Sequence, residues 1–534
     1  MLGFGLGYGF LALKKHCPNT PILIIENDLK GFKTALSLID FSNFFQIKNN
    51  IFFIGKKLDD LEGHFSSEFH FHFGYDGIKF INHPVLTQIY PDYYRKTASM
   101  ITKQLRAHGT EIGSFMVHHH EIVKNFLYNC ASSKNEIQLS SIKNKLSDCP
   151  AFIIGAGPSL TESLEALFKI QSHGIVIATD TSVSPLLAAG IIPDFIVALD
   201  YTKNNLNHFK PIFHHLKSIP LIACYSLYYE IVRDYPGPVG WFATDNPVLA
   251  HFKSESSSTL TNELASGTAL GIELANFLGA SPIIFIGQDL SYRPDFLYAA
   301  DTQKKQIILE KDGQKFLADA QSQSRISSIR TVDGYSGPVE TSIEMETMIR
   351  NIYHLTTQDH PNTYYNFNSQ GAILESTIQL TNPIELKQLA SSYLKKSIPF
   401  EIKKGSRKKF MASAPEVIEP LSQSLFVANE IFKIIDRNKN GKWSKNEADE
   451  INRSRETILG LPYVVAFTEY VNFSRSFLLH KKELKDKPNL EDQISMNRQF
   501  FLMVFEGSQF LIHLLNDILN SENQHPTDGR SPSQ

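Results

Sequence analysis

Cysteine is scarce in this sequence, and its few cysteines form no pairs. The 534 residues include only Cys17, Cys130, Cys149 and Cys224, and none of them lies in a CxxC motif. Without paired or clustered cysteines, neither a disulfide framework nor a zinc site is indicated. The sequence therefore predicts a protein of a reducing compartment, the cytoplasm.

An excess of charge of one sign is also missing. Lys and Arg together number 52 against 55 Asp and Glu, a formal net charge of -3. A protein that binds nucleic acid through its bulk charge carries a clear excess of Lys and Arg. We therefore expect no nucleic acid among the partners of this chain.

Long apolar runs are absent as well. The longest candidates, 191–199 and 283–286, are short or interrupted by Pro and Asp, and they fit buried strands. At the N-terminus, Lys14 and Lys15 follow an apolar stretch, whereas in a secretory signal peptide the basic residues come first. The sequence predicts no membrane span, and we interpret its first residues as folded structure.

Apolar side chains are nevertheless plentiful. The chain is 42% hydrophobic, 11% aromatic and 20% charged, a balance that buries sizeable cores. At roughly 150 residues per domain, the length indicates three or four units. The segment pattern predicts an α/β domain at 1–145, a second α/β domain at 146–382, a helical domain at 383–520 and a disordered tail at 521–534.

The first domain opens with alternating glycines. Gly3, Gly5, Gly7 and Gly9 stand where a strand would turn into a helix, and Glu26 ends the next predicted strand about 20 residues later. This is the arrangement of a nucleotide-binding crossover, yet the strand that should precede the glycines is almost absent. Tight packing of helix against strand is the alternative explanation for the glycines.

From residue 149 onward, apolar strands alternate with amphipathic helices. Strands are predicted at 151–154, 174–179, 195–199, 221–223 and 282–286, and helices at 161–170, 184–189 and 268–278. Such alternation predicts an α/β domain with a doubly wound, mostly parallel sheet. In these sheets ligands bind beyond the carboxyl ends of the strands.

A glycine-rich loop follows the first strand of this domain. Gly155 and Gly157 allow close approach of a ligand, Pro158 fixes the entry into the helix, and Ser159 is able to cap it or to bind phosphate. The segment therefore predicts a phosphate-bearing ligand. A capped helix turn without a ligand is the alternative.

Polar residues also follow the later strands. Asp180 and Asp200 end two strands at the same predicted sheet edge, where each could contact a ligand or cap a turn. Ser266, Gly267 and Thr268 begin a helix, and Gly287, Gln288 and Asp289 end the last predicted strand. Tyr292 and Tyr298 follow, with hydroxyls that could reach a phosphate or rings that pack.

These blocks carry a resemblance. They are GAGPSL (155–160, ending in Leu160), ATD (178–180), GIIPDFIVALD (190–200), SGTA (266–269), LGASPIIFIGQDLSY (278–292) and NFNSQGAIL (366–374). In this order they resemble the central, MptE-like domain of the motility associated factor family, the flagellin glycosyltransferases. They are also similar to bacterial sialyltransferases that use CMP-activated nonulosonic acids. The N-terminal glycines and the helical C-terminal region extend the resemblance over nearly the whole chain.

The resemblance implies a Rossmann-like, sialyltransferase-like central domain and a cytoplasmic enzyme. This enzyme would transfer pseudaminic or legionaminic acid from a CMP donor to Ser or Thr of flagellin. The glycine loop, Asp180 and Asp200 would line the nucleotide pocket, with Ser266 to Thr268, Gly287 and Gln288 beside the nucleotide or sugar. Asp289 and Tyr292 would act near the departing phosphate.

The general base is not evident from the sequence. The sialyltransferases have a histidine after the GxDxxY block, but residues 291–339 contain none. Asp333, Glu340 and Glu344 remain as substitutes, and Ser369 stands where the family tends to carry an acidic residue. The missing histidine and Ser369 suggest one alternative function, a flagellin-binding chaperone without turnover. The central blocks also resemble the fold of archaeal-type hydroxymethylpterin pyrophosphokinases, so an enzyme of that kind, using ATP and Mg²⁺, is the other alternative.

A calcium-loop pattern lies in the helical region. Residues 436–447 match the spacing of an EF-hand loop, with Asp436 first, Gly441 at the turn and Glu447 at the bidentate position. Only the two end residues are acidic, and three lysines crowd the loop. Calcium binding and a polar helix-helix turn are therefore both kept as interpretations, and no other metal is expected.

Overall fold

The computed structural model describes residues 1–17, 22–45, 50–57, 79–132, 134–244, 246–260, 264–293, 297–302, 306–311, 314–319, 325–358, 362–438, 444–471 and 490–521. The chain divides into two compact units. Unit 1 comprises Met1–His119 with Phe473–Phe500, and unit 2 comprises His120–Asn472 with Phe501–Gln534. The predicted boundaries at 145 and 382 stay predictions, and residues 522–534 of the predicted tail lie outside the described residues.

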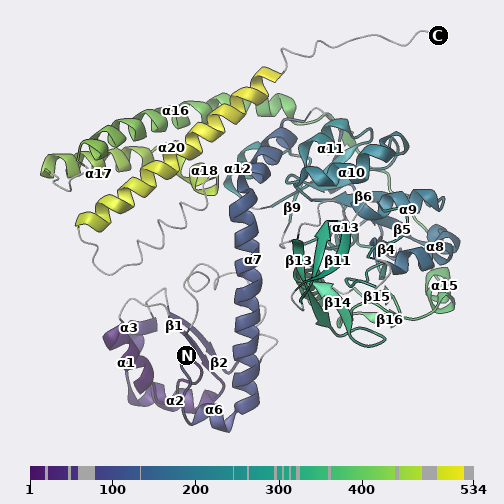
Figure 1. The fold of residues 1–534 in the computed structure, drawn as a ribbon, viewed down its shortest axis with the longest axis horizontal. Coiled ribbons are helices and arrows are strands. Elements are labelled where there is room, and N and C mark those ends of the chain that lie inside the picture. The colour runs from purple at the N-terminus through teal and green to yellow at the C-terminus, as the bar shows by residue number, and fades with distance from the viewer. Residues whose placement is uncertain are drawn as a thin grey trace. The chain divides into compact units, whose positions relative to one another are not determined.

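Unit 1 is built around two parallel strands. In Figure 1 its elements are α1 (Tyr8–His16), β1 (Ile22–Glu26), α2 (Leu29–Leu38), α3 (Ser42–Phe45), β2 (Asn50–Ile54), α6 (Leu86–Ile89) and the first part of α7 (Pro91–Cys130). Strand β1 pairs with β2 in parallel, with Ile22 opposite Asn50. In place of the missing first strand, Leu2 forms single bridges to Ile25 and Asn82. The sequence pattern predicts separate helices at 94–108 and 122–132, whereas α7 is one continuous helix.

The glycine-rich loop of unit 1 is filled by a carboxylate of the same chain. Glu26 is 1% exposed. Its Oε2 accepts hydrogen bonds from the backbone N–H groups of Phe4 (2.7 Å) and Gly5 (3.1 Å), and its Oε1 accepts from Asp28 N–H (2.7 Å) and the Tyr94 hydroxyl (3.1 Å). The acidic residue that the pattern assigns to a ribose thus completes the loop itself, which favours the packing explanation of these glycines.

Glu26→Ala is expected to destabilise unit 1. The substitution leaves four donors without their acceptor, two of them on a loop whose Gly5 has a φ of 58°. Each orphaned buried donor costs about 1–3 kcal/mol, so the loss should reach about 3 kcal/mol or more. Denaturant unfolding and limited proteolysis measure it. Asp92→Ala is the control, since its pair with Arg95 is exposed and should change stability by about 0.5 kcal/mol or less.

Unit 2 contains a large, mostly parallel sheet. Within the described residues it has eleven strands in the order β16-β15-β10-β4-β5-β6-β7-β8-β3-β17, with β9 beside β8. The strands are β3 (Glu136–Ile137), β4 (Ala151–Ile154), β5 (Ile175–Thr179), β6 (Phe195–Ala198), β7 (Leu221–Cys224), β8 (Val239–Ala243), β9 (Ser258–Thr259), β10 (Ile283–Ile286), β15 (Tyr364–Phe367), β16 (Ile378–Leu380) and β17 (Ile402–Lys403). The chain is therefore a mixed α/β protein.

Both faces of this sheet are buried. Along β4, Ile153 packs in a core cluster with Leu270 and Leu274 of α13, while Phe152 and Ile154, on the other face, are also fully buried. The helices of this domain are α8 (Ser159–Ile170), α9 (Val183–Ala188), α10 (Leu206–Phe209), α11 (Tyr229–Asp234), α12 (Pro247–Phe252), α13 (Gly267–Leu278) and α14 (Ile343–Thr357). Continuous apolar strands follow from coverage on both faces.

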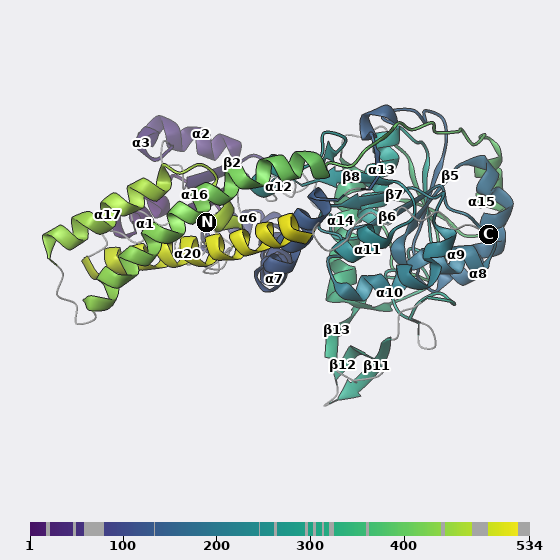
Figure 2. The same ribbon diagram turned by 90° about the horizontal axis from the view of Figure 1, so that it is seen from above.

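A smaller antiparallel sheet follows β10. It has the order β11-β12-β13-β14, from β11 (Gln306–Lys311), β12 (Gln314–Asp319), β13 (Arg325–Val332) and β14 (Val339–Ser342). Figure 2 shows β11 to β13 extending away from the large sheet. Its base is tied to the loop after β10, because the Thr341 hydroxyl donates to Leu290 O (2.7 Å) and Tyr292 N–H donates to Glu340 O (2.7 Å).

The C-terminal part is helical, with one exception. Its helices are α15 (Pro383–Ser391), α16 (Arg407–Arg437), α17 (Lys445–Leu459), α18 (Val464–Val471) and α20 (Leu490–Asn520). The sequence predicts no strand beyond residue 380, but β17 pairs antiparallel with β3. The sequence pattern predicts a helix at 415–435, but α16 starts at Arg407, because Phe410 and Ala414 are buried and extend its packed face.

Candidate functional site

The loops that follow β4 and β10 pack directly on each other. Gly155 N–H donates to Ile286 O (2.9 Å), and Gly157 N–H donates to Gly287 O (2.9 Å). A Cβ atom on Gly155 would lie 2.7 Å from Gly287 O, and one on Gly287, whose φ is 73°, would lie 2.4 Å from Gly155 O. The missing side chains of these glycines, predicted to make room for a ligand, thus allow the backbones of the two loops to pack closely.

The strand order reverses at these two loops. From β4 the chain adds β5, β6, β7 and β8 on one side, and then β10, β15 and β16 on the other. Open parallel sheets bind their ligands where neighbouring connections leave in opposite directions, beyond the carboxyl ends of the strands. The candidate site therefore lies at the ends of β4 and β10.

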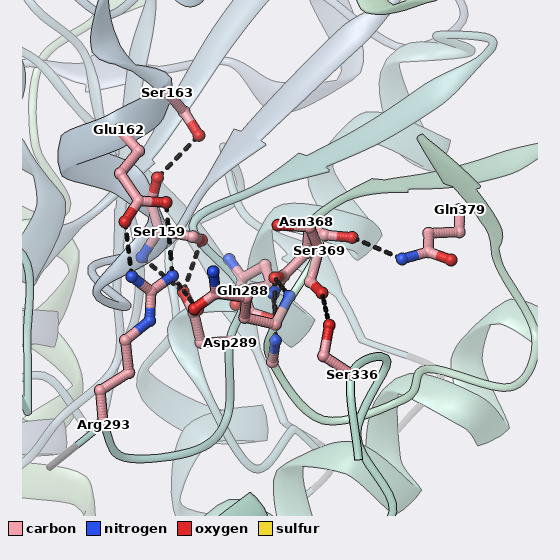
Figure 3. A network of polar contacts seen from close by, with 12 residues as sticks. Ser159, Glu162, Ser163, Gln288, Asp289, Arg293, Ser336, Asn368, Ser369 and Gln379 are labelled. Carbon is pink, nitrogen blue, oxygen red and sulfur yellow. Dashed lines mark hydrogen bonds and ion pairs between the residues drawn. The ribbon is translucent and has the colours of Figure 1, made fainter. Parts of the chain in front are cut away.

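A carboxylate occupies the N-terminus of α8 at this point. Asp289 Oδ2 accepts hydrogen bonds from Ser159 N–H (3.1 Å) and from the Ser159 hydroxyl (2.6 Å), and Figure 3 shows these contacts. No side chain at Pro158 caps the helix. Ser159, predicted to cap α8 or to bind phosphate, instead donates to Asp289, so the carboxylate takes the place predicted for the anion of a ligand.

Asp289 is only partly satisfied. It is 1% exposed, and burial raises the pKa of its carboxyl above the ordinary 3.8, while the Ser159 bonds and the charge of Arg293 oppose that rise. Asp289 Oδ1 has no hydrogen-bond partner within the described structure. Arg293 Nη2 lies 3.8 Å from this oxygen, and Arg293 Nη1 donates to Glu162 of α8 at 2.6 Å.

Other buried polar atoms gather at the same strand ends. Gln288, 3% exposed, accepts from the Thr268 hydroxyl through Oε1 (2.9 Å), while its Nε2 lacks a partner among the described residues. Asn366 Oδ1 in β15 lacks one too, and Asn368 Nδ2 donates weakly to Gln288 O (3.4 Å). Because buried polar groups are normally paired, these atoms mark capacity for a ligand or for water.

Three of these residues had no predicted role. Arg293, Asn366 and Asn368 are brought to Asp289 and Gln288 by the strand order and by hydrogen bonds. Arg293 stands four residues after Asp289, and this nearness in the sequence was a signal for the ion pair between them. The two asparagines lie in the NFNSQGAIL block, which is part of the resemblance but predicts no role for either of them.

The N-terminus of α13 also reaches this sheet edge. Ser266 caps the helix by accepting Ala269 N–H (3.2 Å), and Thr268 bonds Gln288. A Cβ on Gly267 would lie 3.2 Å from Thr179 Cγ2 at the end of β5. The start of α13, with the predicted residues Ser266, Gly267 and Thr268, thus lies beside Gln288.

Asp180 and Asp200 have local partners in turns. Asp180 Oδ1 accepts Thr181 N–H (2.7 Å), and Asp200 Oδ1 accepts Thr202 N–H (2.8 Å). They follow β5 and β6, whose carboxyl ends share the sheet edge with β4. Their contact with a nucleotide stays a prediction, and the turn role of both residues is present.

Tyr292 is a packed residue in this structure. It is 5% exposed, and burial raises the pKa of its hydroxyl. The backbone of Tyr292 bridges to Glu340 of β14. Its predicted role at the phosphate remains a prediction, and the structure adds a role in joining the antiparallel sheet to the β10 loop.

The three proposed bases differ in their surroundings. Glu340 pairs with Lys315 at 2.5 Å, and Glu344 accepts the Ser327 hydroxyl at 2.6 Å. Asp333 O accepts Ile373 N–H (3.0 Å), and the neighbouring Ala372 N–H donates to Asp289 O (2.8 Å). Asp333 is thus linked to Asp289 through one short segment of backbone.

The calcium-loop prediction lies largely outside the described residues, because 439–443 are not among them. Of its ends, Glu447 accepts hydrogen bonds from the Ser444 hydroxyl (2.7 Å), Asn438 Nδ2–H (2.7 Å) and Ser444 N–H (2.9 Å), and these bonds lower the pKa of Glu447 to about 2. Ser444 and Glu447 form a capping box that begins α17. Glu447, the last acidic residue of the loop pattern, therefore stabilises the start of α17.

The fold defines an α/β protein whose candidate ligand site lies at the reversal of its strand order. Residues 123–295, which include the β4 loop and Asp289, match the family model described as 6-hydroxymethylpterin diphosphokinase MptE-like. The structure is similar to that of a MAf glycosyltransferase from Magnetospirillum magneticum AMB-1, with a TM-score of 0.58 and 16% sequence identity, over 97% of this chain and 79% of that chain.

These two findings confirm the resemblance predicted from the sequence blocks. At 16% identity, the structural similarity establishes the fold. No curated protein sequence matches the chain. Of the helices in the described ranges, none has both the length and the apolar character to cross a bilayer.

Proposed function

We propose that this chain is a glycosyltransferase of the motility associated factor type, with a doubly wound, Rossmann-like central domain. Its reaction is the transfer of pseudaminic or legionaminic acid from a CMP donor to Ser or Thr of flagellin in the cytoplasm. The observation that carries the proposal is the site between β4 and β10, where a helix N-terminus meets a carboxylate oxygen and two amide atoms that have no hydrogen bond within the described residues. The likeness to a MAf glycosyltransferase supports it.

This arrangement has the groups that the reaction requires. As the bond between sugar and phosphate breaks, the sugar gains positive and the CMP gains negative charge, so hydrogen-bond donors at the phosphate lower the barrier. Ser159 supplies an N–H and a hydroxyl at the positive end of α8. Gly155, Gly157, Asp180 and Asp200 would line the nucleotide pocket, with Ser266 to Thr268 and Gln288 beside it.

Asp289 and Tyr292 are the proposed catalytic residues. Burial raises the pKa of Asp289, and a raised pKa makes a carboxylate a stronger base towards a hydroxyl of the acceptor. Asp333 is the second candidate, because its backbone is linked to that of Asp289.

Binding of CMP is expected to depend on Ser159. Ser159→Ala removes one donor to the phosphate and should weaken binding about tenfold in calorimetry. Thr161→Ala is the matched control. Thr161 lies two residues after Ser159 and its hydroxyl accepts a hydrogen bond from Ala300 N–H, so this variant should bind CMP as the wild type does. With CMP-pseudaminate or CMP-legionaminate and unmodified flagellin, the wild type should raise the flagellin mass. No mass gain with either donor would contradict the transfer reaction.

The family model favours a second candidate, a pterin pyrophosphokinase that uses ATP. The same calorimetry separates the two, since that function requires ATP to bind in preference to CMP. Flagellin binding without a mass gain would instead support a chaperone.

A further inference from the structure

Two loops of this chain hold a carboxylate of their own, and the two carboxylates differ in how they are bound. Glu26 has four donors, two on each oxygen. Asp289 has two donors, both from Ser159 and both on Oδ2. Each residue is 1% exposed. Equal burial with unequal hydrogen bonding means that Glu26 is fixed in its loop through both oxygens, whereas the hydrogen bonds of Asp289 within the described structure all reach one oxygen.

The second oxygen of Asp289 forms an ion pair but no hydrogen bond within the described structure. Asp289 Oδ1 has no hydrogen bond within the described structure, and Arg293 Nη2 is 3.8 Å away, beyond hydrogen-bond distance. Arg293 is held in place by Glu162 at 2.6 Å, as Figure 3 shows. A small rotation of the carboxylate would exchange its bonds with Ser159 for bonds with a guanidinium that is already positioned.

The end of α8 accommodates one anion. The helix is twelve residues long, and its first N–H groups and dipole attract negative charge. A phosphate placed there needs the same Ser159 N–H and hydroxyl that Asp289 now uses. Two negative charges a few ångströms apart in a buried site repel each other strongly.

We infer that Asp289 is a displaceable occupant of the phosphate position: a phosphate group of the donor replaces it on Ser159, and the released carboxylate moves from its 3.8 Å ion pair with Arg293 to hydrogen-bond distance of that guanidinium. This inference rests on the proposed function, because that function supplies the phosphate. It adds an order of events. The carboxylate reaches its working position only when the donor is bound, so Asp289 is positioned by the substrate.

The inference is tested by whether Asp289→Asn raises or lowers the affinity for CMP. Calorimetry of the full chain with CMP should show that Asp289→Asn binds about tenfold or more tightly than the wild type, because the amide competes without charge. If Asp289 instead contacts the ligand directly, the same substitution weakens binding. Either weaker or unchanged binding overturns the inference.

Asp194→Asn is the matched control. Asp194 also bonds a backbone N–H, that of Val176 at 2.8 Å, and pairs with Lys395, so the net charge changes equally. It lies just before β6, at the other end of the strands, and its affinity for CMP should equal that of the wild type. Tighter binding in this variant would attribute the effect to overall charge and would overturn the inference.

Arg293 provides a second test. Arg293→Ala should weaken CMP binding in the wild-type background, because the displaced carboxylate loses its new partner. In the Asp289→Asn background the same change should have little effect, so the two substitutions are non-additive. Equal weakening in both backgrounds would mean that Arg293 contacts the phosphate itself, and would overturn the exchange.

Inorganic phosphate separates this inference from the proposed function. If the wild type binds no CMP but Asp289→Asn gains binding of phosphate, the donor assignment fails and the exchange stands. If CMP binds and Asp289→Asn does not tighten it, the exchange fails and the donor assignment stands. If neither protein binds CMP or phosphate, both fail.

Discussion

Asp289→Asn is expected to lower the rate of sugar transfer by about a hundredfold or more while the protein remains at least as stable as the wild type. Loss of a catalytic carboxylate removes proton transfer, a contribution of roughly 10²–10⁴ in rate. The amide keeps an oxygen that accepts from Ser159, so the contact between the β10 loop and α8 persists. If the substitution removes activity without lowering stability, the carboxylate serves function and does not stabilise the fold.

The difference in stability between the wild type and this variant should depend on pH in a defined direction. Burial raises the pKa of Asp289 from 3.8, so the folded state binds more protons than the unfolded state between 3.8 and the raised value. The contribution of Asp289 to the stability of the wild type therefore falls as the pH rises through that range and is constant above it. The stability advantage of Asp289→Asn should grow over the same range. Ser159, Arg293 and Glu162 are the groups that act on this carboxyl.

Thermal melts of both proteins at neutral and acidic pH, together with the flagellin mass assay, measure the two effects. Asp194→Asn serves again as the control, with transfer retained. A variant that transfers sugar at the wild-type rate would exclude Asp289 from catalysis. A variant that melts far below the wild type at neutral pH would show that the carboxylate is structural, as Glu26 is.

Gly157→Ala is expected to have the second largest effect, on stability and on ligand binding together. A Cβ at this position would lie 2.1 Å from Asp289 Oδ2 and 2.7 Å from Gly287 O. Gly157 N–H is also bonded to Gly287 O, so the backbone has no freedom to withdraw. Forcing atoms into a packed interior costs about 1–3 kcal/mol or more, and CMP binding should be lost because the β4 and β10 loops separate. Denaturant unfolding and calorimetry measure both.

Gly460→Ala is the matched control for this substitution. Gly460 follows α17 with ordinary contacts, the nearest 3.5 Å away, and the change should alter stability by about 0.5 kcal/mol or less. The double variant Gly157→Ala with Asp289→Ala should recover part of the lost stability, since one of the two clashing groups is removed. Full stability of Gly157→Ala alone would contradict the close packing of these loops.

Much of the central fold follows from local sequence pattern. The strand predicted at 151–154 coincides with β4 (Ala151–Ile154), and the helix predicted at 268–278 matches α13 (Gly267–Leu278) to within one residue. Apolar periodicity is a property of neighbouring residues, so it is readable without a partner. The antiparallel strands β11 to β14 are not predicted, because short charged strands are defined by the strands they pair with.

The site was predictable in its parts. The glycine loop, the Ser266 helix start and the Gly287 to Asp289 segment are recognisable, because strand ends and helix starts have local signals. Their mutual arrangement is not local. Ser159 and Asp289 are 130 positions apart in the chain, and no spacing rule indicates that the serine would donate to the aspartate.

The sequence by itself determined the alternation of strands and helices, the position of the loops that could hold an anion, and the resemblance that names a reaction. Only the tertiary structure decided that these loops carry carboxylates of their own, one bound through both oxygens at Glu26 and one through a single oxygen at Asp289. The physical reason is that local geometry sets which N–H groups a loop exposes, whereas the acceptor that reaches them is brought by a strand from elsewhere in the chain.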